Sequence, residues 1–181
     1  MNIKKKHIIV AVSIAMMLSM LCCVKSVRQN RLPIYKLVRV VDGDTFIVNV
    51  KGKHERVRLL NVNTPESVHP DGSRNTITGR MISAAVKKLL PPGTDVLLQN
   101  DEGTDNRDRY NRLLRYMFIP GEITGSQVEY INFNVWLVKT GWSPYYTKYG
   151  QSKKYDKEFR EAENYSKKKK MGIWGKIKRI R

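Results

Sequence analysis

Three short segments of this chain carry residue types suited to phosphate chemistry: VVDGDTF at 40–46, RLLNVNTPE at 58–66 and DRYNR at 108–112. Asp44 offers a carboxylate, which hard cations such as calcium bind together with amide, backbone and water oxygens. Glu66 can accept a proton from an attacking water. Arg58 and Arg112 can each present a forked guanidinium to phosphate oxygens. Together these groups suit the cleavage of a phosphodiester.

Each segment also has a purely structural interpretation. DGDT is a common turn, and TPE is a common entry to a turn or helix because proline fixes the backbone. An isolated strand arginine such as Arg58 is most often solvated or ion-paired. The chemical interpretation therefore depends on the ordered combination of the three segments and their spacing.

The elements around these segments predict a small barrel. Apolar and polar residues alternate on each side of Asp42-Gly43-Asp44, which indicates a β-hairpin. Further strands are predicted at 54–62, 94–100 and 112–119, and helices at 76–90, about 127–140 and about 152–170. Pro91-Pro92-Gly93 and Gly141 are expected to end the first two helices. The predicted fold is α+β, mainly a five-stranded barrel of the kind that commonly binds nucleic acid, with three helices.

The first 26 residues differ from the rest of the chain. MNIKKKH is basic, and residues 8–24 form an apolar or small-residue run before charge returns at Lys25. This layout is typical of a signal peptide, although an uncleaved membrane anchor and lipidation at Cys22 or Cys23 remain open. We therefore expect export, either secreted or membrane-attached with the domain outside the cytoplasm. The predicted divisions are 1–26 signal or anchor, 27–32 linker, 33–175 domain and 176–181 basic tail.

The charge balance points to an anionic partner. The chain carries +18, and removal of residues 1–26 takes away four lysines and no acids, which leaves +14. Nucleic acid is the first candidate partner, because binding to phosphates releases counterions, and an anionic membrane surface is the second. Both cysteines lie before residue 27, so the predicted domain has no disulfide and no cysteine metal site.

The ordered motifs resemble the thermonuclease family, the staphylococcal-nuclease-like domains. The resemblance covers most of residues 33–175 and includes VVDGDT, RLLNVNTPE, GRMISAAVKKLL, DRYNR, KTG and the late GIW. It implies a five-stranded OB-fold barrel with three helices. It also implies calcium-dependent hydrolysis of DNA and RNA. For the oligomeric state, a monomer is the default expectation.

The resemblance implies a role for each matching position. Calcium would be bound by Asp44, the residue at 63 and the Thr64 backbone carbonyl. The catalytic groups would be Arg58, Glu66 and Arg112. Substrate would be gripped by Arg109 and stacked on Tyr110, with Tyr146 or Tyr149 as further stacking candidates.

Two positions depart from the family pattern. Asn63 stands where the family usually has aspartate, which removes one negative charge from the expected metal site, and Asp42 is a possible compensating carboxylate. Asn111 stands where the family usually has glycine, and asparagine tolerates the left-handed backbone that a turn there needs. We expect an active nuclease with a weakened metal site. The alternatives are a nucleic-acid-binding module that does not cut, and a membrane-surface protein that uses its basic segments.

Overall fold

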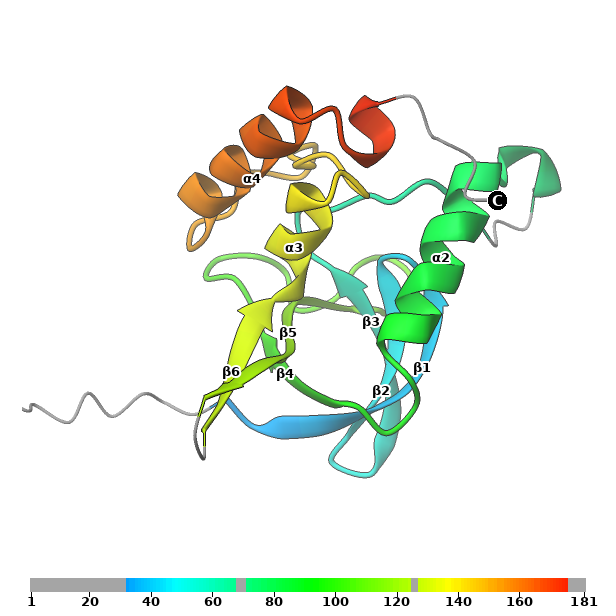
Figure 1. The fold of residues 1–181 in the computed structure, drawn as a ribbon. Helices are drawn as coiled ribbons and strands as arrows, with labels where there is room; N and C mark the ends of the chain where they lie inside the picture. The colour runs from blue at the N-terminus through cyan, green and yellow to red at the C-terminus, as the bar shows by residue number, and fades with distance from the viewer. Residues whose placement is uncertain (1–31, 68–70, 125–126, 176–181) are drawn as a thin grey trace, which may run out of the picture. The chain divides into compact units, whose positions relative to one another are not determined.

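The chain forms six strands and three α-helices in the part that the structure describes. This computed structural model describes residues 32–67, 71–124 and 127–175 (Figure 1). The strands are β1 (Ile34–Asp42), β2 (Thr45–Val50), β3 (Lys53–Leu59), β4 (Asp95–Gln99), β5 (Leu113–Thr124) and β6 (Gln127–Asn132). The helices are α2 (Ile77–Leu89), α3 (Phe133–Lys139) and α4 (Asp156–Lys168), with 3-10 turns η1 (Gly72–Arg74) and η2 (Gly172–Trp174).

Five of the strands close into a barrel. The sheet order is β3-β2-β1-β4-β5-β6, and an additional pairing of β3 with β5 joins the two sides of the sheet. This closing pair is parallel, with Val57 opposite Leu113 and Leu59 opposite Arg115. The predicted five-stranded OB-fold barrel with three helices is confirmed, and β6 is a hairpin extension of β5 outside the closed ring.

The β1–β2 hairpin presents the first motif at the mouth of the barrel. Asp42 pairs with Thr45, so Gly43 and Asp44 form the two-residue connection. On the other face of the hairpin, Leu37 and Val48 are buried in the core. A Cβ on Gly43 would lie 2.7 Å from the Thr64 hydroxyl oxygen. The turn can therefore approach the segment after β3 this closely because position 43 has no side chain.

The helices cover the barrel at separate places (Figure 1). Thr76 caps α2 by accepting a hydrogen bond from the Gly79 N–H. The helix lies beside the barrel, and α3 and α4 pack together. The predicted ends are confirmed: α2 ends at Leu89 before the proline pair, and Gly141, with φ +70°, follows α3.

The predicted helix from about 127 to 140 is wrong in its first half. Residues 127–132 form β6 and pair with β5, and only Phe133–Lys139 are helical. Val128 and Ile131 therefore belong to the strand. Asn132 separates the two elements, because its side chain accepts the N–H groups of Asn134 and Val135 as an N-cap. The tertiary partner β5 decides the conformation of this β-branched segment.

Two other predicted boundaries also shift. The third strand ends at Leu59 rather than at 62, because Asn61 has a left-handed φ of +57°. The last helix begins at Asp156 rather than near 152, because Ser152 is buried and bonds Tyr116 instead of starting the helix. Both shifts occur where polar side chains link separate segments.

Several predictions fall outside the described residues. The signal or anchor at 1–26, most of the linker at 27–32 and the basic tail at 176–181 all lie there. Among the residues that the structure describes, no helix is long and apolar enough to cross a membrane. The predicted domain divisions stay predictions.

Candidate active site

A cleft of about 1170 Å³ opens beside the barrel mouth. Its walls come from the β1–β2 turn, β3 with the segment that follows it, and the segments around 101–112 and 146–151. Every residue that the sequence singled out lines this cleft: Asp44, Arg58, Asn63, Thr64, Glu66, Arg109, Tyr110, Arg112, Tyr146 and Tyr149. The structure thus brings together residues spread over more than half of the chain.

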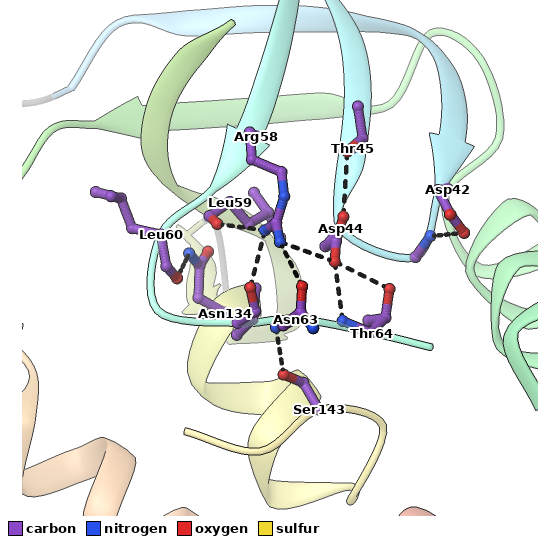
Figure 2. Close-up of polar contacts among 12 residues, drawn as sticks. Asp42, Asp44, Thr45, Arg58, Leu59, Leu60, Asn63, Thr64, Asn134 and Ser143 are labelled. Atoms are coloured by element: carbon purple, nitrogen blue, oxygen red, sulfur yellow. Dashed lines mark hydrogen bonds and ion pairs between the residues drawn. The ribbon is translucent and has the colours of Figure 1, made fainter. Parts of the chain in front are cut away.

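Asp44 is buried in the turn and fully engaged in hydrogen bonds (Figure 2). Its Oδ2 accepts from the Thr64 backbone N–H at 2.8 Å and from the Thr64 hydroxyl at 3.1 Å. Its Oδ1 accepts from the Thr45 hydroxyl at 3.1 Å. The carboxylate is therefore fixed in place, with Thr64 directly against it.

Arg58 extends from β3 and holds a positive charge between the two candidate metal ligands. Its Nη2 lies 3.3 Å from Asp44 Oδ2 and donates to Asn63 Oδ1 at 3.1 Å (Figure 2). Its Nη1 donates to the carbonyls of Leu59 and Val62, each at 2.8 Å. The guanidinium is thus a stand-in cation, and the oxygens of Asp44 and Asn63 already converge on it. Carboxylate and amide oxygens are the donors that calcium accepts, so this pair fits a hard cation.

Ser143 positions the backbone at Asn63. The Asn63 N–H donates to Ser143 Oγ at 2.7 Å, and the Ser143 hydroxyl donates to the Pro144 carbonyl. Asn134 on α3 is also buried and donates to the Leu60 carbonyl at 2.8 Å. Sequence reasoning missed both residues, because an isolated Ser or Asn near a helix carries no signal for a contact more than 70 positions away.

Glu66 is held through its backbone rather than its side chain. The Thr76 N–H donates to the Glu66 carbonyl at 2.9 Å, and a Cβ on Gly79 would clash with that same carbonyl. The start of α2 therefore packs directly on this segment. In the part of the chain that the structure describes, the Glu66 carboxylate makes no hydrogen bond or ion pair and is available to the cleft.

The role of Asp42 as a compensating carboxylate stays a prediction, and its oxygens bond the turn and Ser67. Its Oδ1 accepts from the Gly43 N–H at 2.7 Å and from the Ser67 hydroxyl at 2.6 Å. Its Oδ2 accepts from the Ser67 N–H at 3.3 Å. Asp42 therefore ties the turn to the segment after Glu66, while Asn63 lies on the Arg58 side of Asp44 (Figure 2).

The DRYNR segment is a tight turn built around Asp108. The Asp108 carboxylate accepts from the N–H groups of Tyr110 and Arg112 and from Arg112 Nε at 2.7 Å. Burial opposes ionisation of Asp108, but these bonds outweigh it and hold its pKa below the ordinary value. Asn111 has φ +61°, which confirms the predicted left-handed turn. Asp108 is part of the DRYNR motif, but no role was predicted for it.

Arg109 and Arg112 both lie against the Tyr110 ring. Their guanidinium carbons are 4.8 Å and 5.3 Å from the ring centroid. Arg109 also donates to the Tyr110 hydroxyl at 2.7 Å. Tyr110 is 63% exposed and lines the cleft, so this wall of the cleft carries an aromatic group together with two cations.

A second ion pair anchors this turn to the barrel. Arg107 makes a two-pronged contact with Glu55 on β3, at 2.9 Å and 3.0 Å, and also donates to the Asn111 carbonyl. The hydrogen bond from Arg107 lowers the pKa of Glu55, and the same contact raises the pKa of Arg107. Neither residue was singled out from the sequence.

A buried polar network positions the tyrosine side of the cleft. The Tyr116 hydroxyl lies within hydrogen-bond distance of Asn61, Asp101 and Ser152, and burial raises its pKa. Asn61 donates to the Gly150 carbonyl and its carbonyl accepts from the Tyr146 N–H. These bonds fix the backbone on either side of Tyr149, whose side chain is 81% exposed. The ring centroids of Tyr146 and Tyr149 lie 6.0 Å apart.

The acidic side chains that line the cleft do not form a metal-binding cluster in the part of the chain that the structure describes. Among the described residues, no group of three or more His, Cys, Asp or Glu side chains could hold an ion. A cation here would depend on Asp44 together with neutral oxygens, as the sequence predicts for Asn63 and the Thr64 carbonyl.

Comparison with known proteins identifies the family. Residues 56–176 match the family described as staphylococcal nuclease homologue. The chain is 34% identical over 151 residues to endonuclease YncB of Bacillus subtilis (strain 168), covering 83% of this chain and 66% of that protein. It is 33% identical over 140 residues to the thermonuclease of Staphylococcus intermedius, covering 77% of this chain and 75% of that protein. The chain therefore belongs to the staphylococcal nuclease homologue family.

Proposed function

We propose that this protein is a calcium-dependent nuclease that hydrolyses phosphodiester bonds of DNA and RNA. The observation that carries the proposal is the convergence of Asp44 Oδ2 and Asn63 Oδ1 on one cationic nitrogen. The same cleft contains Glu66, whose carboxylate has no partner among the residues that the structure describes. The names of the relatives, endonuclease and thermonuclease, support the same reaction class.

Each of the predicted site residues has a separate role in the proposed hydrolysis. A bound calcium ion, held by Asp44, Asn63 and the Thr64 carbonyl, would neutralise charge on the attacked phosphate. Glu66 takes the proton from the water that attacks phosphorus, as the bond to the leaving oxygen breaks in line. Arg58 and Arg112 hold the phosphate and stabilise the charge that develops on its oxygens.

The two arginines reach this role from different starting contacts. Arg112 uses Nε and Nη2 for Asp108 and lines the cleft, and among the described residues its Nη1 makes no hydrogen bond. Arg58 uses Nη2 for Asp44 and Asn63, so this nitrogen must exchange partners when a cation enters. Metal entry and a shift of Arg58 are therefore coupled in this proposal.

Incubation of the purified full chain with single-stranded DNA or RNA, in millimolar calcium or in chelator, tests the function. We expect cleavage only with calcium, and much less with Glu66→Gln under the same conditions. Cleavage that persists in chelator would contradict a metal-dependent mechanism. Binding without cleavage, with any divalent ion, would contradict the nuclease proposal.

A non-catalytic nucleic-acid-binding module is the second candidate. Asn63 favours it, since one carboxylate is missing beside Asp44 and Arg58 occupies the space between the two oxygens. Binding without cleavage is the result that supports this candidate. A third candidate, a membrane-surface protein, would use the lysines at 167–170 and the basic segment 176–181. It predicts binding to anionic vesicles with no need for metal.

We also propose that the protein is exported and acts as a monomer. The basic start and apolar run of residues 1–26 support export. Fractionation of producing cells tests this, because nuclease activity confined to the cytoplasm would contradict it. Light scattering of the purified chain tests the oligomeric state.

A further inference from the structure

A second arginine, Arg56, lies on the same face of β3 as Arg58, farther from the reaction centre. Side chains two positions apart on a strand point to the same face, so Arg56 and Arg58 project together. Both line the cleft. Arg56 pairs across the sheet with Ile47 on β2, and Ile47 pairs with Arg39 on β1. Arg56 and Arg39 therefore flank Ile47 on the outer face of the barrel.

These two arginines differ from the other arginines of the site in having no partner. Arg58 pairs with Asp44, Arg107 with Glu55, and Arg112 with Asp108. In the described ranges of the chain, Arg39 and Arg56 make no ion pair or hydrogen bond, and both are exposed. The nearest carboxylate along β3, Glu55, points to the other face and is taken by Arg107.

We propose that Arg56 and Arg39 form an accessory phosphate-binding track for a single nucleic-acid strand that leaves the cleft over the outer face of β3, β2 and β1. This inference rests on the proposed nucleic-acid substrate. Two observations support it: Arg56 belongs to the cleft wall, and neither guanidinium has a counter-charge within the described part of the chain. A solvated surface arginine is the ordinary alternative, and it predicts no effect on binding.

The spacing along the track suits a flexible strand. Arg56 and Arg58 are two residues apart, about 6.6 Å along the strand, and Arg39 lies two strand spacings from Arg56, about 9.5 Å. Ile47 between the arginines is only partly buried and offers an apolar contact. A positive groove that follows the backbone is how single strands are bound without sequence preference.

The effect on binding follows from counterion release. Each phosphate contact to a single strand contributes about 0.7 to the slope of log affinity against log salt. Loss of both contacts should reduce the magnitude of this slope by about 1.4. Between 50 mM and 200 mM salt, that difference corresponds to about a sevenfold change in the ratio of wild-type to variant affinity.

The test is fluorescence anisotropy of the full chain with a labelled 16-nucleotide oligothymidylate, in chelator so that no hydrolysis occurs. The variant Arg39→Gln/Arg56→Gln is compared with Lys87→Gln/Lys88→Gln, which removes the same charge from exposed positions on α2. Arg39→Lys/Arg56→Lys keeps the charge and serves as the conservative variant. We expect a smaller slope of log affinity against log salt only in the Arg39→Gln/Arg56→Gln variant. With a 4-nucleotide probe, we expect this variant to lose less affinity than with the 16-nucleotide probe.

Equal slopes in the two glutamine variants would overturn the track, as would failure of the wild-type chain to bind the probe. Loss of binding to phosphatidylserine vesicles with unchanged oligonucleotide binding would assign the face to a membrane instead, and would also overturn it. The experiment separates failure of the track from failure of the proposed nuclease function. If the wild-type chain never cleaves but the glutamine variant lowers the salt slope of binding, the track is supported and the nuclease function is not. If the chain cleaves but the variant leaves the slope unchanged, the track is contradicted.

Discussion

Restoring a carboxylate at position 63 should strengthen metal binding. In the structure, Asn63 Oδ1 and Asp44 Oδ2 both lie within 3.3 Å of the same Arg58 nitrogen. Asn63→Asp would therefore add a negative charge where a cation is already drawn in. The side chains of Arg58 and Asp44 are only 15% and 10% exposed, whereas Asn63 is itself exposed, so water screens part of the new charge.

The size of the effect follows from two opposing contributions. Two unit charges about 4 Å apart interact by about 4 kcal/mol at an effective dielectric constant of about 20. The new carboxylate would also pair with Arg58 in the metal-free protein, which offsets part of the gain. A net gain of about 1.4 kcal/mol would tighten calcium binding about tenfold.

Calorimetric titration of calcium into the full chain measures this directly. Lys88→Gln is the matched control, because it lowers the net charge by the same one unit at an exposed position of α2. We expect tighter binding in Asn63→Asp alone. An unchanged calcium affinity would refute the assignment of residue 63 as a metal ligand.

Three further predictions concern the other walls of the cleft. Glu66→Gln should lower kcat by about 10²-fold or more with substrate affinity retained, since a positioned base contributes this much; equal turnover would remove Glu66 from the mechanism. Tyr110→Ala should weaken single-strand binding by about 1–3 kcal/mol, which is the usual contribution of a stacked base. Fluorescence anisotropy in chelator measures this, and an unchanged affinity would show that this exposed ring does not stack on a base. Asp108→Asn should destabilise the fold at neutral pH in urea unfolding, because Asp108 bonds Arg112 through its charged form. The pKa of Asp108 is lowered, so this stabilisation is present above its ordinary value of 3.8 and is lost as the pH falls through the folded pKa. A stability difference that does not shrink as the pH falls below 3.8 would contradict this reason.

The local patterns of the sequence were sufficient where short-range geometry decides the structure. The alternation around Asp42-Gly43-Asp44 predicts a hairpin with a tight turn there, and β1 and β2 form that hairpin. The positive φ at Asn111 follows from the tolerance of asparagine for the left-handed region. The residues of the three motifs meet in one cleft because each lies at the end of a strand or in a loop of the same barrel mouth.

The second predicted helix shows where local patterns fail. Val128 and Ile131 fit an apolar helical face as well as a strand, and nothing within the segment decides between them. Pairing with β5 makes residues 127–132 a strand, and the Asn132 cap then starts the helix. The conformation of residues 127–132 therefore depends on β5, a strand outside this segment.

The amino-acid sequence is enough to predict the chemical groups of the site: an aspartate in the hairpin turn, an asparagine at position 63, a glutamate, the arginines and a five-stranded barrel that carries them. How these groups are paired depends on the folded arrangement. Arg58 lies between Asp44 and Asn63, and Ser143 fixes the Asn63 backbone from 80 positions away. Arg107 engages Glu55, whereas Arg56 has no counter-charge among the described residues. The physical reason is that residue type sets which bonds a side chain can make, whereas closure of the barrel and packing of the helices set which distant groups come within the few ångströms that those bonds require.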